Sequence, residues 1–402
     1  MVKSLLFAAC LAFPVALLAQ TTYTEVSLPE LMKKKQQDPN IVIVDVRTDG
    51  EYYDSATNYK QGNIGRIKGA IHIGLQDLAE KPDAIKQLDA YKDKEVYLIC
   101  SHSYRSRVAS NILLKNGFTH VNNVRGGMTE WFRRYDELSP YRNDFYETSD
   151  KYVNLSPSQL YKKLNSGEKF LLIGIASVPH FFYDSLTIQL FQYLPAFKNV
   201  TYFNAGDSMQ VLEKIKKEKP SSVVLFNTVN NGAAEMTDWL TQQGISNVSY
   251  LVGSENLFYE YARNNKMIPA ADKFLVNKSK INFITPPVYC EDITKGKPMQ
   301  LIDLRIDSLF NKVNSGTKYN FKHLKEAINF PEAKGIDQFM QQFPDKRTTY
   351  VFISNNGING IELADALTKK GYTINWLIGG LQRYEWYMNN VETYGCMDRL
   401  VL

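Results

Sequence analysis

The pattern of hydrophobic and polar positions repeats one arrangement along the chain. In each copy a β-branched and aromatic run typical of a buried strand meets a polar turn, and an amphipathic helix follows that ends at a glycine. The copies read EVYLICSHSYRSRVASNILLKNGF, SSVVLFNTVNNGAAEMTDWLTQQGI and TTYVFISNNGINGIELADALTKKGY. Cys100, Asn227 and Ser354 hold the same place in the three copies and are equally spaced. The number of residues from one of these positions to the next is typical of the length of a whole domain.

Further apolar runs recur in the same phase. Each copy is preceded by IVIVDVRTDGEY, FLLIGIASVPHF or MQLIDLRIDSLF and followed by VNNVRGGMTEWF, VSYLVGSENLFY or INWLIGGLQRYEW. Strands therefore alternate with helices, which predicts α/β domains, each with a mostly parallel sheet flanked by helices. The polar segments ELSPYRNDFYETSD and NNKMIPAADKFLVNKSK mark the borders. We expect three tandem domains, over residues 20–145, 146–275 and 276–402.

The chain begins with MVKSLLFAACLAFPVALLAQ, which has the pattern of a secretory signal peptide over residues 1–19, cut after Ala19. A lipoprotein signal acylated on Cys10 is the alternative, and it is disfavoured because only about six apolar residues precede that cysteine. No later segment approaches the roughly 18 consecutive apolar residues of a membrane-spanning helix. The expected location is periplasmic or secreted, with no membrane span.

Composition and charge narrow the class of protein. With 44% hydrophobic and 22% charged residues, the 402-residue chain resembles an ordinary globular protein. Its net charge of +5 is small and its basic residues are dispersed, so nucleic acid is not an expected partner. Removal of the signal leaves Cys100, Cys290 and Cys396. In an oxidising compartment Cys290 and Cys396 could form a disulfide, although the sequence gives no distance between them.

Cys100 is the candidate nucleophile. It follows a predicted parallel strand, at the sheet edge where ligands bind in open α/β sheets, and the next helix directs free N–H groups back toward it. These amides, the helix dipole and Arg105 favour a thiolate or the terminal sulfur of a persulfide, and they attract anionic donors. A buried cysteine that acts only as a small hydrophobic residue is the alternative, and the polar turn argues against it.

The set IVDVRTDGEY, GRIKGAIHI, YLICSHSYRSRVAS, a helix ending in NGF, and VRGGMTEW resembles the rhodanese (sulfurtransferase) domain, motif by motif and in order. The third repeat is similar through LIDLRID, KHLKEAINFP and IGGLQRYEW, and the second only in periodicity and turn placement. The resemblance implies that Cys100 takes sulfane sulfur from thiosulfate, a persulfide or a polysulfide. It holds this sulfur as Cys–S–SH and passes it to a thiol or a cyanide-like acceptor. No cofactor and no metal ion are expected.

That role falls on Cys100 alone, because Asn227 and Ser354 cannot form a persulfide. The remaining loop residues are expected to bind substrate: Ser101, His102, Ser103, Tyr104, Arg105 and Ser106. Cysteine phosphatases of related architecture use Cys-x5-Arg, which forms a ring wide enough for phosphate. The Cys-x4-Arg spacing here suits a single sulfur better, and it disfavours a phosphatase or arsenate reductase.

Individual loop residues allow alternatives. Ser103 stands where the family often has glycine, which leaves the backbone of the turn open. Ser106 could cap the helix or donate a hydrogen bond from its start. His102 either acts on the leaving group or the donor, or is an exposed histidine without a role. Tyr104 either lines the mouth of the pocket or packs on its neighbours, and packing is favoured.

Asp45 and Arg47 recur as Asp303 and Arg305 in a repeat without the cysteine. We therefore interpret them as structural, with Asp45 accepting from backbone donors and Arg47 bracing the adjacent loop. Glu51 is expected to pair with Arg47.

A function of another class also fits the two repeats that lack the cysteine. The chain could be a non-catalytic rhodanese-like interaction scaffold, whose degenerate repeats bind a partner. A protein thiol is the expected kind of protein partner.

Overall fold

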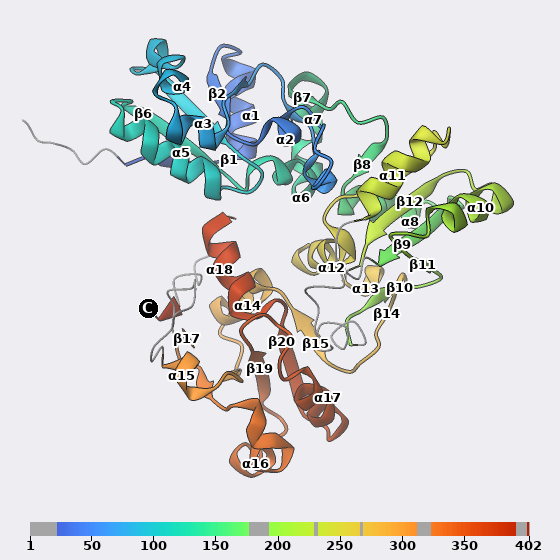
Figure 1. Ribbon diagram of the computed structural model, residues 1–402. Helices are drawn as coiled ribbons and strands as arrows, with labels where there is room; N and C mark the ends of the chain where they lie inside the picture. Colours follow the sequence, from blue (N-terminus) through green and yellow to red (C-terminus); the bar gives the residue numbers. More distant parts are fainter. Residues whose placement is uncertain are drawn as a thin grey trace, which may run out of the picture.

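The computed structural model describes residues 22–176, 193–228, 232–265, 268–311, 323–390 and 400–401. The predicted signal peptide with Cys10, and also Cys396, lie outside the described residues. Three domains follow one another along the chain, and each is built on a five-stranded parallel sheet (Figure 1). The predicted fold class, tandem α/β domains with mostly parallel sheets flanked by helices, is therefore correct.

The first domain has the strand order β1-β6-β5-β2-β4, and every pairing in this sheet is parallel. A short antiparallel pair, β3 with β7, lies apart from it. The strands are β1 (Thr24–Ser27), β2 (Val42–Asp45), β3 (Arg66–Ile67), β4 (Ile71–His72), β5 (Glu95–Ile99), β6 (His120–Arg125) and β7 (Tyr146–Glu147). The helices are α1 (Leu28–Gln37), α2 (Asp49–Tyr52), η1 (Lys60–Gly62), α3 (Leu75–Glu80), α4 (Pro82–Lys86), η2 (Asp89–Tyr91), α5 (Tyr104–Lys115), η3 (Gly127–Thr129), α6 (Glu130–Arg133) and α7 (Tyr135–Phe145).

The second domain repeats this topology as β8-β13-β12-β9-β11, again with parallel pairings. Its strands are β8 (Val153–Leu155), β9 (Leu171–Ala176), β10 (Ala196–Phe197), β11 (Thr201–Asn204), β12 (Val223–Asn227), β13 (Val248–Leu251) and β14 (Leu275–Val276). Its helices are α8 (Pro157–Asn165), α10 (Ser208–Glu218), α11 (Ala233–Gln242), α12 (Ser254–Asn264) and α13 (Ile268–Ala271).

The third domain has the order β15-β20-β19-β16-β18. Its strands are β15 (Asn282–Ile284), β16 (Gln300–Asp303), β17 (His323–Leu324), β18 (Ile328–Asn329), β19 (Thr349–Ile353), β20 (Thr373–Leu377) and β21 (Leu400–Val401). Its helices are α14 (Pro286–Thr294), α15 (Asp307–Phe310), η4 (Glu332–Lys334), α16 (Gly335–Gln342), α17 (Ile361–Lys369) and α18 (Gly380–Asn390).

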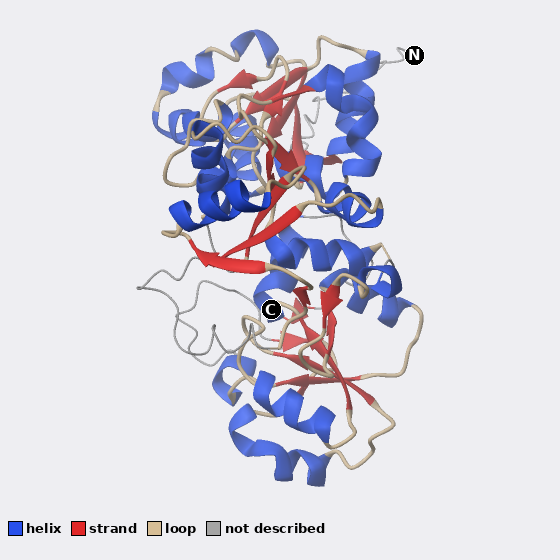
Figure 2. Cartoon of the chain, turned by 90° about the vertical axis from the view of Figure 1, so that its right-hand side faces the viewer, coloured by secondary structure: helices blue, strands red, loops and turns tan. Residues whose placement is uncertain are grey.

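The central strand of each sheet carries the repeated turn at its carboxyl end. Strands β5, β12 and β19 are buried nearly throughout, as expected for parallel strands covered on both faces by helices. Cys100 directly follows β5, Asn227 is the last residue of β12, and Ser354 directly follows β19. Figure 2 shows the strands lying between layers of helices. The fold thus places the three repeated positions at equivalent edges of three sheets.

The domains pack against one another through apolar and ionic contacts. One apolar cluster continues from Trp131 in the first domain to Tyr250 in the second. Lys60 and Asp238 form an ion pair at 2.8 Å across the same interface. Helices α12 and α18 lie toward the centre of the molecule in Figure 1, with α18 directed toward the first domain. Within the described part of the chain, no helix combines the length and apolar character needed to cross a membrane.

Candidate active site

Cys100 is a free thiol, 1% exposed, between strand β5 and helix α5. Its Sγ accepts a hydrogen bond from the backbone N–H of Ser103 at 3.1 Å and one from Ser106 Oγ at 3.4 Å. Both donors lie at the first turn of a 12-residue helix, whose N-terminus favours negative charge. The sulfur therefore lies where a thiolate, or the charged end of a persulfide, finds ready donors.

Ser103 adopts a backbone conformation that glycine normally takes. Its φ is +140° and its ψ is −31°, nearly the values of Gly232 at the corresponding turn of the second domain. A side chain in this region strains the backbone by about 1–3 kcal/mol. The conformation is held by Asn123, whose Nδ2 donates to Ser103 Oγ at 3.1 Å. Ser106 Oγ adds a contact at 3.0 Å to the Ser103 carbonyl, and its single O–H is shared between this carbonyl and Cys100 Sγ. Because serine stands where the family often has glycine, the sequence did not fix the conformation of this turn. The structure shows that Ser103 adopts the conformation typical of glycine, at a cost in backbone strain.

Arg105 is fixed by a carboxylate from another segment. Its guanidinium donates to both oxygens of Glu51, at 2.5 and 2.7 Å, and to Ser101 Oγ at 2.8 Å. The expected pairing of Glu51 with Arg47 is wrong. Burial acts to raise the pKa of Glu51, but the hydrogen bond and charge of Arg105 outweigh it and hold that pKa below its usual value. Glu51 is therefore ionised and orients Arg105 beside the loop.

The sequence held a signal for this arrangement. Thr48 and Glu51 have the spacing of a capping box, and each side chain bonds the backbone N–H of the other at the start of α2. This motif fixes Glu51 at the head of a short helix, with its carboxylate turned back toward the N-cap. Only the tertiary structure brings α2 next to α5, so the partner of Glu51 was not visible in the sequence.

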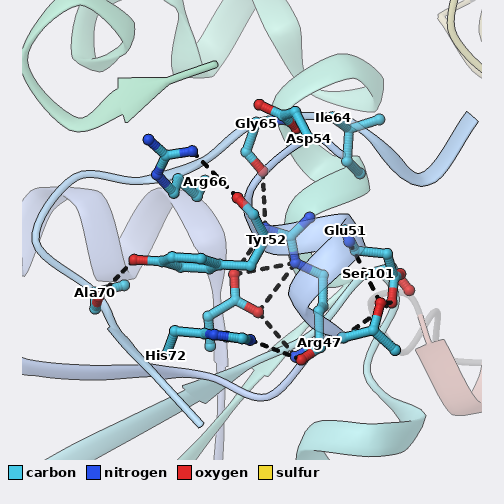
Figure 3. Close-up of polar contacts among 12 residues, drawn as sticks. Arg47, Glu51, Tyr52, Asp54, Ile64, Gly65, Arg66, Ala70, His72 and Ser101 are labelled. Carbon is cyan, nitrogen blue, oxygen red and sulfur yellow. Dashed lines mark hydrogen bonds and ion pairs between the residues drawn. The ribbon is translucent and has the colours of Figure 1, made fainter. Parts of the chain in front are cut away.

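Asp45 and Arg47 form a fully buried ion pair at 2.8 Å. Asp45 Oδ1 accepts from the backbone N–H of Arg47 at 3.0 Å, and Arg47 Nη2 also donates to the Gly65 carbonyl at 2.8 Å. Figure 3 shows Arg47 within this network, with Glu51 and Ser101 to one side. Asp303 and Arg305 repeat the pair, also at 2.8 Å, in the third domain. The pair ties the end of a strand to its neighbouring loop in both domains.

His102 and Tyr104 project differently from the loop. The His102 ring is half-buried and meets Trp386 edge-on at 5.7 Å between centroids. Of the two alternatives for this residue, the exposed side chain is therefore wrong, and a role toward the leaving group or the donor stays a prediction. Burial, and then the charges of Arg133, Arg383 and Arg105, lower the pKa of His102 to about 4. His102 is therefore uncharged at physiological pH and does not carry the second ring proton that a general acid would donate. Tyr104 is 66% exposed, so the expected packing on its neighbours is also wrong.

The corresponding turns of the other domains use neutral oxygens. Asn227 Oδ1 accepts from the backbone N–H of Ala233 at 2.9 Å, and Ser354 Oγ accepts from that of Gly357 at 2.9 Å. A backbone N–H of the turn thus meets sulfur in the first domain, an amide oxygen in the second and a hydroxyl oxygen in the third. Both side chains are buried and bonded, which fits a structural role for these turns.

The turn after β6 donates hydrogen bonds to the backbone of the Cys100 loop. Met128 N–H donates to the Cys100 carbonyl at 2.8 Å, and both the N–H and the Oγ1 of Thr129 donate to the Ser101 carbonyl at 3.1 Å. A Cβ on Gly127 would lie 2.2 Å from the Cys100 carbonyl oxygen, so only glycine permits this approach. Sequence reasoning identified this glycine turn but not its contact with the loop.

Cys290 is the other cysteine among the described residues, and it belongs to the third domain. Cys290 is buried in α14 and is disulfide-bonded. Cys396, its predicted partner, lies outside the described residues.

Comparison with known proteins identifies the family. The model of the rhodanese-like domain matches residues 28–134 and 287–386, which lie in the first and third domains. The chain therefore belongs to the rhodanese-like domain family, which includes sulfurtransferases.

The matched relatives share limited parts of their length with this chain. A tRNA uridine(34) hydroxylase of Synechocystis sp. is 33% identical over 104 residues, which are 26% of this chain and 34% of that protein. The match thus spans about a third of this curated relative. The crystal structure of a rhodanese-like domain protein from Staphylococcus aureus is 28% identical, with a TM-score of 0.21, and covers 27% of this chain and 90% of that one. Thiosulfate sulfurtransferase from Pseudomonas aeruginosa is 15% identical, with a TM-score of 0.23, over 94% of this chain and 67% of that one.

Proposed function

We propose that the protein is an exported sulfurtransferase that carries sulfane sulfur as a persulfide on Cys100. The observation that supports this most directly is the loop geometry, in which the free Cys100 Sγ lies within reach of two donors at the N-terminus of α5. Arg105, held by Glu51, places a guanidinium in a fixed position beside the loop. Asn227 and Ser354 leave one such site among the three repeated turns.

The first half of the reaction loads the thiol. The Cys100 thiolate attacks the outer sulfur of thiosulfate, an Sγ–S bond forms, and the S–S bond of the donor breaks. The electron pair of that bond leaves with sulfite. In the second half a thiolate acceptor attacks the outer sulfur of the persulfide, and the electron pair returns to Cys100. Sulfur moves without an external oxidant or reductant, and the donors at Ser103 and Ser106 stabilise the charged sulfur in both halves.

Mass spectrometry of the Cys100 peptide tests this proposal. The protein is incubated separately with thiosulfate and with a polysulfide, and we expect a gain of one sulfur atom on Cys100 that a thiol or cyanide then removes. Cys100→Ser is the control and should gain none. A folded wild-type protein that acquires no sulfur from either donor would contradict the proposal.

Export is the part of the proposal that rests on the first 19 residues. N-terminal sequencing of the protein purified from the envelope or medium of its own cells should begin at Gln20. A chain that still begins at Met1 in the cytoplasmic fraction would contradict export and leave the sulfur chemistry untouched.

An interaction scaffold remains the second candidate, favoured by the neutral side chains of Asn227 and Ser354 at two of the three turns. It predicts capture of a protein partner, for example one with an accessible thiol, that persists unchanged in Cys100→Ser. Absence of sulfur loading together with such capture would favour the scaffold over the carrier.

A further inference from the structure

A cavity of about 360 Å³ lies where the three domains meet, next to the Cys100 loop. Most of its wall comes from equivalent segments of the three domains. In each domain this segment is the glycine turn and helix that follow the strand beside the central strand of the sheet. The first domain supplies Thr129 and Arg133, at the ends of η3 and α6. The second and third supply residues of α12 and α18 and of the turns before them: Gly253, Leu257, Glu260, Gly379, Arg383 and Trp386. The two domains without a nucleophile thus complete a cavity beside the domain that has one.

The Cys100 loop forms part of the same wall. His102, two residues after the thiol, lines the cavity, and its ring meets Trp386 of the third domain. Thr129 also lines the cavity and donates two hydrogen bonds to the Ser101 carbonyl, at 3.1 Å each. A molecule in the cavity would therefore contact the loop that carries the sulfur.

Two guanidinium groups flank the indole of Trp386. The guanidinium carbon of Arg383 lies 4.2 Å from the ring centroid, and that of Arg133 lies 5.1 Å from it. Arg383 is already neutralised by Glu260, which accepts from it at 2.7 Å and from the Tyr387 hydroxyl at 2.9 Å.

The charge of Arg133 is less completely satisfied. Its Nη1 lies 3.8 Å from the nearest Glu130 oxygen, beyond hydrogen-bonding distance, and has no hydrogen-bond partner among the described residues. A largely buried guanidinium with unused donor capacity favours an anion. Nearby Val252, Leu257 and Ile378 give the cavity apolar walls as well.

Cavity size and lining together indicate the class of ligand. The volume falls in the range of small-molecule sites, about 300–1,000 Å³, and exceeds what an inorganic oxyanion needs. Mixed apolar and aromatic walls with one undersatisfied guanidinium suit an organic molecule that carries a carboxylate. A thiol on such a molecule would supply the nucleophile that reacts with the neighbouring persulfide.

We propose that this cavity, defined by His102, Arg133, Leu257, Arg383 and Trp386, binds a small organic thiol bearing a carboxylate and presents it to the sulfur on Cys100. This inference rests on the proposed function. The bound thiolate attacks the outer sulfur of Cys100–S–SH, the S–S bond breaks, and its electron pair returns to Cys100 as the thiolate. The acceptor leaves as its own persulfide, so that atoms and electrons balance.

Binding is tested first, without sulfur chemistry. Full-length Cys100→Ser is titrated with 3-(methylthio)propionate and with 3-(methylthio)propanol, which differ in the carboxylate, and binding is followed by NMR. We expect the carboxylate to bind about tenfold more tightly, as for one charge-assisted hydrogen bond. Arg133→Gln should abolish the difference. Arg134→Gln is the matched control, because it removes the same charge one residue away, where Arg134 pairs with Glu137 at 2.7 Å.

A second variant tests the cavity independently, in case Arg133→Gln does not fold. Leu257→Phe adds bulk to the cavity and keeps every charge, and it should weaken binding of both probes. Equal binding of the two probes, or equal effects of Arg133→Gln and Arg134→Gln, would overturn the inference.

Transfer is tested second, with wild-type protein loaded on Cys100. Sulfur transfer to 3-mercaptopropionate should exceed transfer to 2-mercaptoethanol about tenfold at equal thiolate concentration, and Arg133→Gln should equalise them while Cys100 still loads. If Cys100 loads but the two thiols accept equally, the inference fails and the sulfurtransferase stands. If Cys100 never loads, the proposed function fails, and the binding titration still decides whether the cavity selects carboxylates.

Discussion

The guanidinium of Arg105 and the carboxylate of Glu51 form a bidentate ion pair that joins helix α5 to helix α2. Glu51 is 5% exposed, and its own orientation is fixed by Thr48. The pair is neutral overall, but it fixes the Arg105 guanidinium beside the Cys100 loop, where an anionic donor must approach, and it also bonds Ser101 within that loop. Its strength therefore bears on both stability and sulfur loading.

Glu51→Gln should weaken both properties. Removing one partner leaves the Arg105 charge without its carboxylate, and loss of a buried partner costs about 3 kcal/mol or more. We expect a lower free energy of unfolding in urea and a slower loading of Cys100 by thiosulfate, by about tenfold to a hundredfold, because Arg105 is no longer held in place. Glu137→Gln, which removes a carboxylate from the more exposed pair with Arg134, should change neither. Unchanged loading in a folded Glu51→Gln protein would exclude a positioning role.

The same pair gives an acid-range pH dependence. The pKa of Glu51 is lower in the fold than its usual value of 4.5, so its stabilising contribution is present above that value and is lost as pH falls through the folded pKa. Urea unfolding of wild type and Glu51→Gln should therefore converge as pH is lowered from 4.5 through the folded pKa of Glu51. A stability difference that does not shrink in acid would contradict the ionised pair.

Ser103 provides a test of backbone strain in the loop. Ser103→Ala and Ser103→Gly both lose the hydroxyl that accepts from Asn123, but only glycine takes a φ of +140° without a steric penalty. The glycine variant should be more stable than the alanine variant by about 1–3 kcal/mol in urea unfolding. At Ala109, inside helix α5, the preference should reverse, with glycine less stable by about 1 kcal/mol. Equal stability of the two Ser103 variants would show that the loop relaxes.

The sequence was sufficient for the fold because each repeat carries its own local signals. Apolar runs, glycine-terminated helices and polar turns are read from neighbouring residues, and they place Cys100 and Arg105 on one loop. Contacts between segments distant in sequence were not readable. The Glu51–Arg105 pair joins residues 54 apart, and the contact of His102 with Trp386 joins two domains. Such contacts depend on how helices and domains pack, which periodicity does not specify.

Asp150, where the chain passes from the first to the second domain, should make stability fall as pH rises. Burial, and then the charge of Asp54, raise the pKa of Asp150 to about 7, although Asn154 donates to it at 2.7 Å. The folded pKa lies above the usual 3.8, so the fold favours the protonated acid, and stability is lost as pH rises from about 4 through about 7.

Replacing Asp150 by asparagine removes this titration. Asp150→Asn should flatten the pH profile of unfolding and be more stable than wild type at pH 8 by about 2 kcal/mol, allowing for solvent screening. Asp144→Asn, on an exposed residue of α7, is the control and should leave the profile unchanged. A wild-type profile that is flat between pH 4 and 8 would refute the raised pKa.

Ser354→Cys in the Cys100→Ser background asks whether a thiol alone is sufficient for sulfur loading. The new thiol would occupy a buried turn and could accept from the Gly357 N–H that now meets Ser354 Oγ at 2.9 Å. Asn359, however, has the same spacing from Ser354 as Arg105 has from Cys100, although Asn359 precedes α17 and Arg105 lies in the first turn of α5. Without that guanidinium we expect loading by thiosulfate at about a hundredth of the wild-type rate or less, measured by mass spectrometry of the peptide around residue 354. Adding Asn359→Arg should recover part of the rate. Loading of the double variant at the wild-type rate would show that Arg105 is dispensable and that the turn alone activates the thiol.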